Sequence, residues 1–195
     1  MKDKIRSIFD LCLGLLILIA TVCAYFGHWD NLGEYCCISG ITTGTIFTAS
    51  FFYRRKSGKF FPEWIYINCS VATIIILIAT IGLGLNLNGA FIFIHIIDPL
   101  LMFLYWAIFC EHESRIRTLP TVLVFPVVYT LLSGTILMIT GDCPFPASLV
   151  LTGHTPVVTA LLVIAVYALL LLVASVYYYG AWLKRRRLQA SQGKT

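Results

Sequence analysis

The sequence predicts an all-α, polytopic membrane protein with six transmembrane helices and both termini in the cytoplasm. Three observations lead to this prediction: an apolar composition, six separate apolar stretches, and basic residues confined to alternate connecting segments. Of the 195 residues, 59% are hydrophobic and 12% are charged, and the mean hydropathy is +0.88. Soluble domains are roughly 45–50% apolar and about 25% charged. So few charges cannot cover a soluble surface, and lipid must therefore cover part of this one.

Six apolar stretches are long enough to cross a bilayer, which takes about 20 helical residues. They are Phe9–Phe26, Leu32–Phe52, Ile65–Leu85, Gly89–Phe109, Thr121–Ile139 and Val157–Leu183. The second is rich in Ser and Thr, which favours a place inside the bundle. The last is long enough to tilt or to project from the membrane. We expect residues 1–188 to form a single six-helix transmembrane domain and residues 189–195 a disordered cytoplasmic tail.

The basic residues give the orientation. All 14 Lys and Arg residues lie before the first stretch, between the second and third, between the fourth and fifth, or after the sixth. Because cytoplasmic segments retain Lys and Arg during insertion, both termini are placed in the cytoplasm. Topology and anionic headgroups also explain the net charge of +5, so no nucleic-acid partner is expected.

The first stretch and the cysteines each allow two interpretations. The first stretch begins like a signal peptide, but its apolar run is long and no clear cleavage site follows, which favours a retained helix. The seven cysteines show no zinc-ligand spacing, so no metal site is expected, and we expect no cofactor. Cys143, Cys36 and Cys37 lie on the predicted outer side, where a disulfide or free thiols would both fit.

Only two ionisable residues, His95 and Asp98, lie well inside a predicted span, and both are on the fourth. Such residues are costly in a membrane and are functional candidates by default. Their spacing of three places them on one helix face, and Pro99 frees a backbone carbonyl near His95. The alternative is a pair that only holds helices together.

One face of the second stretch carries small and nucleophilic side chains. They are Cys36, Ser39, Gly40, Thr43 and Gly44. The two glycines form a small-xxx-small pair, so one interpretation of this face is close packing against another helix. In the other interpretation the face carries a nucleophile. Both the second and the fourth span start outside, and Cys36 would therefore lie at a depth similar to that of His95.

These residues would fit a nucleophile and its base, brought close enough for a hydrogen bond once substrate is present. The nucleophile would be Cys36, Ser39 or Thr43. His95 would take its proton, and Asp98 would orient the ring or set the local charge. A site at this depth would meet a membrane lipid or fatty ester, which is the partner we expect. The oligomeric state is left open.

Three short motifs occur in a fixed order. In the fourth stretch, Pro99 follows His95 by four residues and Trp106 follows the proline by seven. The fifth stretch contains Pro126-Val-Val-Tyr129, and the next connection contains Cys-Pro-Phe-Pro at residues 143–146. With the six-span layout, these motifs resemble the androgen-induced protein family and its bacterial six-helix relatives.

The resemblance implies an intramembrane hydrolase that cleaves fatty acid esters of hydroxy fatty acids. Its nucleophile would lie at the outer start of the second span and its histidine on the fourth, where His95 fits. Ser39 matches a serine of the bacterial relatives, whereas Cys36 stands at their threonine position and Gly40 at their asparagine position. The expected substrate-binding residues are Thr43, Trp106, Tyr129, Pro144 and Phe145. The bacterial relatives imply a multi-pass protein of the plasma membrane.

The connection after the fifth stretch is expected to form a rigid, extended lid over the outer mouth. Pro144 and Pro146 fix their φ angles and lack backbone donors, which favours this conformation.

Three function classes remain: a lipid-ester hydrolase, a non-catalytic lipid-binding or accessory protein, and a small transporter. The sequence shows no inverted repeat and no matched broken helices, which disfavours the transporter.

Overall fold

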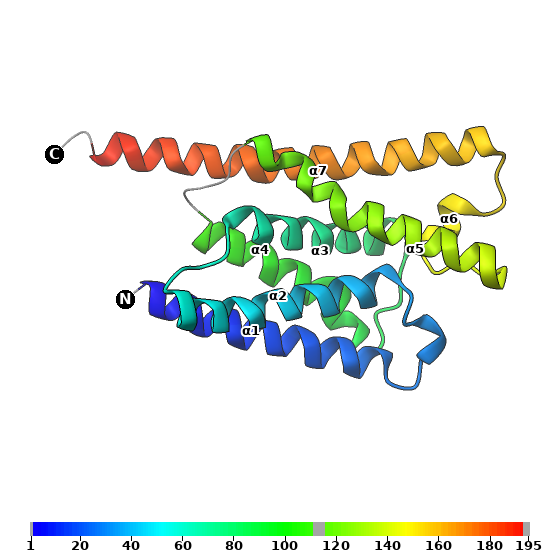
Figure 1. Ribbon diagram of the computed structural model, residues 1–195, viewed down its shortest axis with the longest axis horizontal. Helices are drawn as coiled ribbons and strands as arrows, with labels where there is room; N and C mark the ends of the chain where they lie inside the picture. Colours follow the sequence, from blue (N-terminus) through cyan, green and yellow to red (C-terminus); the bar gives the residue numbers. More distant parts are fainter. Residues whose placement is uncertain (1, 111–115, 193–195) are drawn as a thin grey trace.

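The computed structural model describes residues 2–110 and 116–192, and within these ranges every regular element is a helix. The long helices are α1 (Lys2–Tyr25), α2 (Tyr35–Ser57), α3 (Glu63–Leu83), α5 (Val124–Thr140) and α7 (Pro156–Gln192). The shorter elements are η1 (Trp29–Asn31), η2 (Phe93–Ile97), α4 (Asp98–Phe109), η3 (Ile116–Leu123) and α6 (Ala147–Leu151). In Figure 1 the start of α1 and the end of α7 lie at the same end of the molecule.

Within the described residues, five helical segments are long and apolar enough to cross a membrane by length and composition. They are Asp3–Tyr25, Tyr35–Ser57, Glu63–Leu83, Ile116–Thr140 and Pro156–Arg187. They correspond to the first, second, third, fifth and sixth predicted stretches. The fourth stretch was predicted from residue 89 but forms the shorter apolar helix Phe93–Phe109. Gly89 has a φ of 57°, and this left-handed turn keeps the helix from starting there.

The helix α7 runs past the predicted end of the transmembrane domain. It continues to Gln192, four residues into the segment predicted to be disordered, while residues 193–195 lie outside the described part. Its 37 residues would measure about 55 Å at 1.5 Å per residue, well beyond a hydrocarbon core of about 30 Å. The Lys184 ammonium donates to the carbonyls of Trp106 and Ala107 near the end of α4. The last turns of α7 therefore extend past the end of α4.

The helices α1 and α2 pack in close contact through glycines on both (Figure 1). A Cβ atom added to Gly14 would lie 2.6 Å from the Thr48 backbone nitrogen, and one added to Gly44 would lie 2.7 Å from Leu18 Cγ. One added to Gly40 would collide with the Thr21 hydroxyl. The predicted role of Gly40 and Gly44 in close helix packing is confirmed, and α1 is the helix that approaches them.

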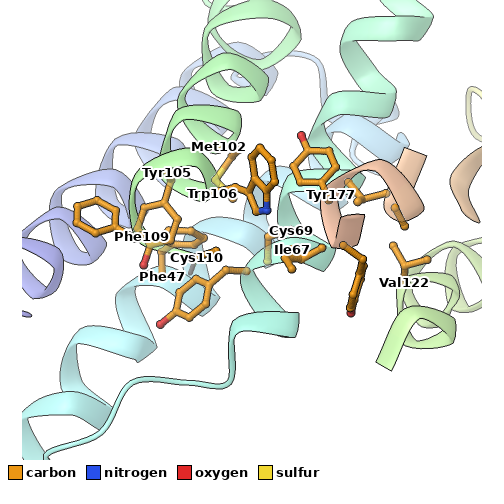
Figure 2. Packing of buried hydrophobic residues seen from close by; sticks show 14 of the residues in the cluster. Phe47, Ile67, Cys69, Met102, Tyr105, Trp106, Phe109, Cys110, Val122 and Tyr177 are labelled. Carbon is orange, nitrogen blue, oxygen red and sulfur yellow. The ribbon is translucent and has the colours of Figure 1, made fainter. Parts of the chain in front are cut away.

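The buried apolar residues form two clusters along the molecule. The larger contains Phe47, Tyr105 and Trp106, and in Figure 2 the Trp106 ring of α4 faces Tyr177 of α7. Their ring centroids are 4.8 Å apart. The smaller cluster contains Tyr35 and Cys36 of α2 and Ile94 of η2. Of the residues predicted to form the site, Cys36 and Tyr129 belong to this smaller cluster, and His95 directly follows its Ile94.

Candidate functional site

His95 lies in a π-helical turn at the start of the fourth helix. The amide of Asp98 donates to the carbonyl of Phe93, five residues back, which is the π pattern. Pro99 has no amide to donate to the carbonyl of His95, four residues before it, and its ring would clash with that carbonyl in a regular α-helix. The proline thus accounts for the wider turn, and π turns are frequent at functional sites.

The His95 ring is buried, and in the described part of the chain it has one hydrogen-bond partner. Its Nδ1 lies 2.7 Å from the backbone oxygen of Asn86, in the loop that precedes the helix. A carbonyl oxygen can only accept, so Nδ1 carries the proton of the neutral ring. Nε2 then keeps its lone pair, as a general base requires.

Glu34 is a shared neighbour of His95 and Cys36. Its carboxylate interacts electrostatically with both side chains. The Tyr25 hydroxyl donates to Glu34 Oε2 at 2.8 Å and so fixes the carboxylate in place. Cys36 itself is buried at the first turn of α2. A thiol, an imidazole and a carboxylate are thereby gathered at one end of the bundle.

The other two candidate nucleophiles have different surroundings. The Ser39 hydroxyl donates to the backbone oxygen of Cys36 at 3.2 Å, within its own helix. Thr43 lies beside the Cys69 thiol of α3. Within the described ranges, no hydrogen bond joins Cys36, Ser39 or Thr43 to His95. Their convergence in the presence of substrate stays a prediction.

Asp98 is buried but does not hydrogen-bond His95 in the part of the chain that the structure describes. Its Oδ1 atom has no hydrogen-bond partner, and its carboxyl group interacts electrostatically with Cys69. His95 instead reaches the loop at Asn86. The two ionisable residues of the fourth helix thus have different partners, and the role predicted for Asp98 in orienting the ring has no contact to support it.

Two cavities border α5. The Thr43 cavity, of about 480 Å³, lies between α2, α3 and the η3–α5 segment and includes Ser39, Thr43, Asn68 and Thr121 among otherwise mainly apolar walls. The Tyr35 cavity, of about 310 Å³, lies between α3, α5, α6 and α7. Both cavities are partly open, and each has the size and apolar lining of a small-molecule site.

The connection after α5 lies across the ends of α2 and α5. The carbonyl of Phe145 accepts from the Tyr35 amide at 3.1 Å and from the Tyr129 hydroxyl at 2.8 Å. Pro144 packs against Gly33, and the Phe145–Pro146 peptide is cis. Tyr129 and Pro146 also line the Tyr35 cavity. The segment predicted to be an extended lid instead turns at Phe145 and Pro146, and it is fixed to both helices beside this cavity.

Trp106 lies apart from the other residues predicted to contact substrate. It is eleven residues from His95, or about 16 Å along a helix. Its ring packs in the larger cluster, and a Cβ atom on Gly180 would lie 2.8 Å from it. Trp106 therefore joins α4 to α7 in the packed core, and none of its contacts supports a substrate-binding role.

A buried polar network surrounds Asp10 of α1, and the sequence did not predict it. The Asp10 carboxylate accepts from the hydroxyls of Tyr105 at 2.6 Å, Ser50 at 2.7 Å and Tyr66 at 3.4 Å. Arg6 Nε donates to the Tyr105 oxygen at 3.0 Å. These residues join α1, α2, α3 and α4. The available signal was a carboxylate, Asp10, one residue inside the first predicted span.

The comparisons with known proteins add no assignment. No protein-family model, curated protein or solved structure matches the chain. The resemblance to the androgen-induced protein family stays a prediction, and any function has to be argued from the geometry above.

Proposed function

We propose that this chain is a six-span membrane protein that hydrolyses lipid esters within the membrane. Cys36 is the nucleophile and His95 is the general base. The observation that carries the proposal is the 2.7 Å contact from His95 Nδ1 to the Asn86 carbonyl, because it leaves Nε2 as a proton acceptor. Cys36 is preferred because it belongs to the buried cluster that also contains Ile94, the residue before His95, whereas the Ser39 hydroxyl is bonded within its own helix and Thr43 lies beside Cys69.

The reaction proceeds in two balanced steps. His95 Nε2 takes the Cys36 thiol proton as sulfur bonds to the ester carbonyl carbon, and it returns the proton to the alkoxide that leaves. Water then gives a proton to Nε2 while its oxygen bonds to the thioester carbon, and the thiolate leaves and recovers the proton. One ester and one water become one acid and one alcohol. The Glu34 charge stabilises the transient imidazolium.

Turnover of a fluorogenic medium-chain ester by the purified protein in lipid nanodiscs tests the roles of both residues. We expect Cys36→Ala and His95→Ala to abolish turnover, and Cys36→Thr to keep part of it because a hydroxyl is also a nucleophile. Labelling by a lipid-like, cysteine-directed probe should be lost in the same two alanine variants.

Matched controls are available for both residues. Cys37→Ala removes the adjacent buried thiol, and His154→Ala removes an exposed histidine. Both variants should keep wild-type turnover. Unchanged turnover in His95→Ala, or equal losses in Cys36→Ala and Cys37→Ala, would remove the catalytic assignment.

The topology proposed is six spans with both termini in the cytoplasm. The fourth segment is helical from residue 91 to Phe109, about 28 Å at 1.5 Å per residue, which is close to the thickness of a hydrocarbon core. Reporter fusions at Asn31, Asn88 and Asp142 should all report the outer side, and one at Lys56 the cytoplasm. A cytoplasmic signal at Asn88 would exclude the fourth span.

A second candidate function is lipid binding without chemistry. The Thr43 cavity favours it, because the cavity is partly open, its wall is mainly apolar, and His95 is not among its lining residues. In that case a photoactivatable lipid should crosslink to the protein while every variant at Cys36 and His95 binds like the wild type and none has turnover.

A further inference from the structure

The Thr43 cavity begins near the end of the molecule at which both termini lie. Its lining includes Phe61, in the connection between α2 and α3, and Trp64, in the first turn of α3, and it continues along this helix to Ala72. In Figure 1 the connection between α2 and α3 lies toward the end with the two termini. The eight residues from Trp64 to Ala72 extend over about 12 Å at 1.5 Å per residue. The cavity therefore follows α3 inward from that end.

The walls of this cavity suit an acyl chain. Apolar side chains from three elements form most of them, including Ile46 of α2, Ile65 of α3 and Val128 of α5. Val124 and Val128 line the cavity and are 61% and 50% exposed, so its rim at α5 is part of the molecule's outer surface. In a membrane this surface meets lipid, and a chain that enters here does not cross water.

The polar side chains of the wall include several that are already bonded within the protein. The Asn68 amide donates to the Thr121 hydroxyl at 3.0 Å, and that hydroxyl donates to the carbonyl of Thr118 at 2.6 Å. The Ser39 hydroxyl donates to the carbonyl of Cys36. Among the described lining residues none is charged. A charged headgroup attached to the chain must therefore lie outside the cavity.

Two basic residues lie close to the lining at the end where the termini lie. Lys59 precedes Phe61 by two residues, and Arg117 precedes Thr121 by four residues of η3, about 8 Å at 2.0 Å per residue. Both side chains are exposed, and neither forms an ion pair or a hydrogen bond in the described ranges. Tryptophan is enriched at the headgroup level of membranes, which fits Trp64 at the same end. A negative headgroup at this level would meet both cations.

We propose that the Thr43 cavity binds one acyl chain of an anionic phospholipid from the cytoplasmic leaflet, with the headgroup phosphate beside Lys59 and Arg117. The inference rests on the lipid-binding function and on the topology proposed above. The apolar wall accepts the chain of any phospholipid, whereas the two cations favour a negative headgroup, and the cytoplasmic leaflet carries such lipids. Neither Cys36 nor His95 lines this cavity, so the bound lipid is not the substrate of the proposed hydrolysis.

Occupation of the cavity is tested with a phosphatidylglycerol that carries a diazirine in its acyl chain. The probe is added to the full-length protein in phosphatidylcholine nanodiscs. It should crosslink to the lining residues of α3. Val128→Trp fills the cavity and should reduce this crosslinking at least tenfold, whereas Val127→Trp changes the neighbouring exposed valine, which is outside the lining, and should not. Equal crosslinking in the two variants would overturn the cavity assignment and the lipid-binding function with it.

The headgroup is tested with a phosphatidylcholine probe that has the same diazirine chain. In the wild type, crosslinking to the α3 lining should favour phosphatidylglycerol at least tenfold, because two basic side chains attract its charge. Lys59→Gln with Arg117→Gln should abolish this preference and keep the phosphatidylcholine signal. The control pair Arg185→Gln and Arg187→Gln removes two exposed cations of α7 and should keep the preference. Equal labelling of the wild type by both probes, still lost in Val128→Trp, would overturn the headgroup assignment but keep the lipid-binding function.

Discussion

The contact between α1 and α2 gives a prediction that can be worked from distances. Gly44→Ala adds one methyl group at their interface. The new Cβ would lie 2.7 Å from Leu18 Cγ and 2.8 Å from the carbonyl oxygen of Gly14. The second contact is with backbone, which cannot rotate away as a side chain can. The two helices must therefore separate at this point.

The expected loss follows from the size of the overlap. Ordinary van der Waals contact begins at 3.4 Å, so the helices must move by about 0.7 Å to restore it at Leu18. Overpacking by one methyl group in a rigid interface costs about 1–3 kcal/mol. For a chain of this length that corresponds to a fall of about 2–12 °C in Tm.

The assay is thermal unfolding of the purified protein in one detergent. The measured signal is the fraction that still elutes as a monodisperse, folded peak after heating to each temperature. Gly82→Ala is the matched control, because Gly82 is helical and a Cβ atom there meets nothing within 4 Å. The control should match or slightly exceed the wild type, since Ala favours helix over Gly. Equal Tm values for the two variants would refute the close packing of α1 on α2.

Three further predictions test other parts of the structure. Tyr105→Phe removes a donor to Asp10 and an acceptor for Arg6, and it should lower the free energy of unfolding by about 1–3 kcal/mol. The control Tyr53→Phe changes an exposed tyrosine and should leave the stability unchanged. Equal losses of stability in the two variants would argue against the network. Replacing Pro144 and Pro146 with Ala should lower ester turnover more than expression, because the lid segment borders the Tyr35 cavity; equal losses would mean that the loop serves folding alone. Burial raises the pKa of the Cys143 thiol above its ordinary value of 9.0. The rate at which Cys143 is alkylated, measured in a protein with Cys12 and Cys23 replaced by Ala, should therefore still increase above pH 9. A rate that becomes constant below pH 9 would contradict this.

The Asp10 network shows where hydropathy alone gives too little information. Asp10 is one residue inside the first apolar stretch, and a carboxylate at a span edge is ordinarily solvated. In the folded protein it is fully buried and paired with hydroxyls from three other helices. Those partners are 40 to 95 residues away along the chain. No local pattern reports such a pairing, because it depends on how the helices are rotated against one another.

The sequence by itself determined the positions of the long apolar helices, since a lipid environment requires an uninterrupted apolar run for each of them. It also predicted the close packing at Gly40 and Gly44, but not that α1 was the partner. Tertiary structure alone decided the neighbours of the buried polar groups. His95 meets the Asn86 carbonyl, Asp98 lies near Cys69, and Glu34 interacts with both His95 and Cys36. Hydrophobicity is a sum over local residues, whereas a hydrogen bond needs two groups at one distance and angle, and only the packing of the helices sets these.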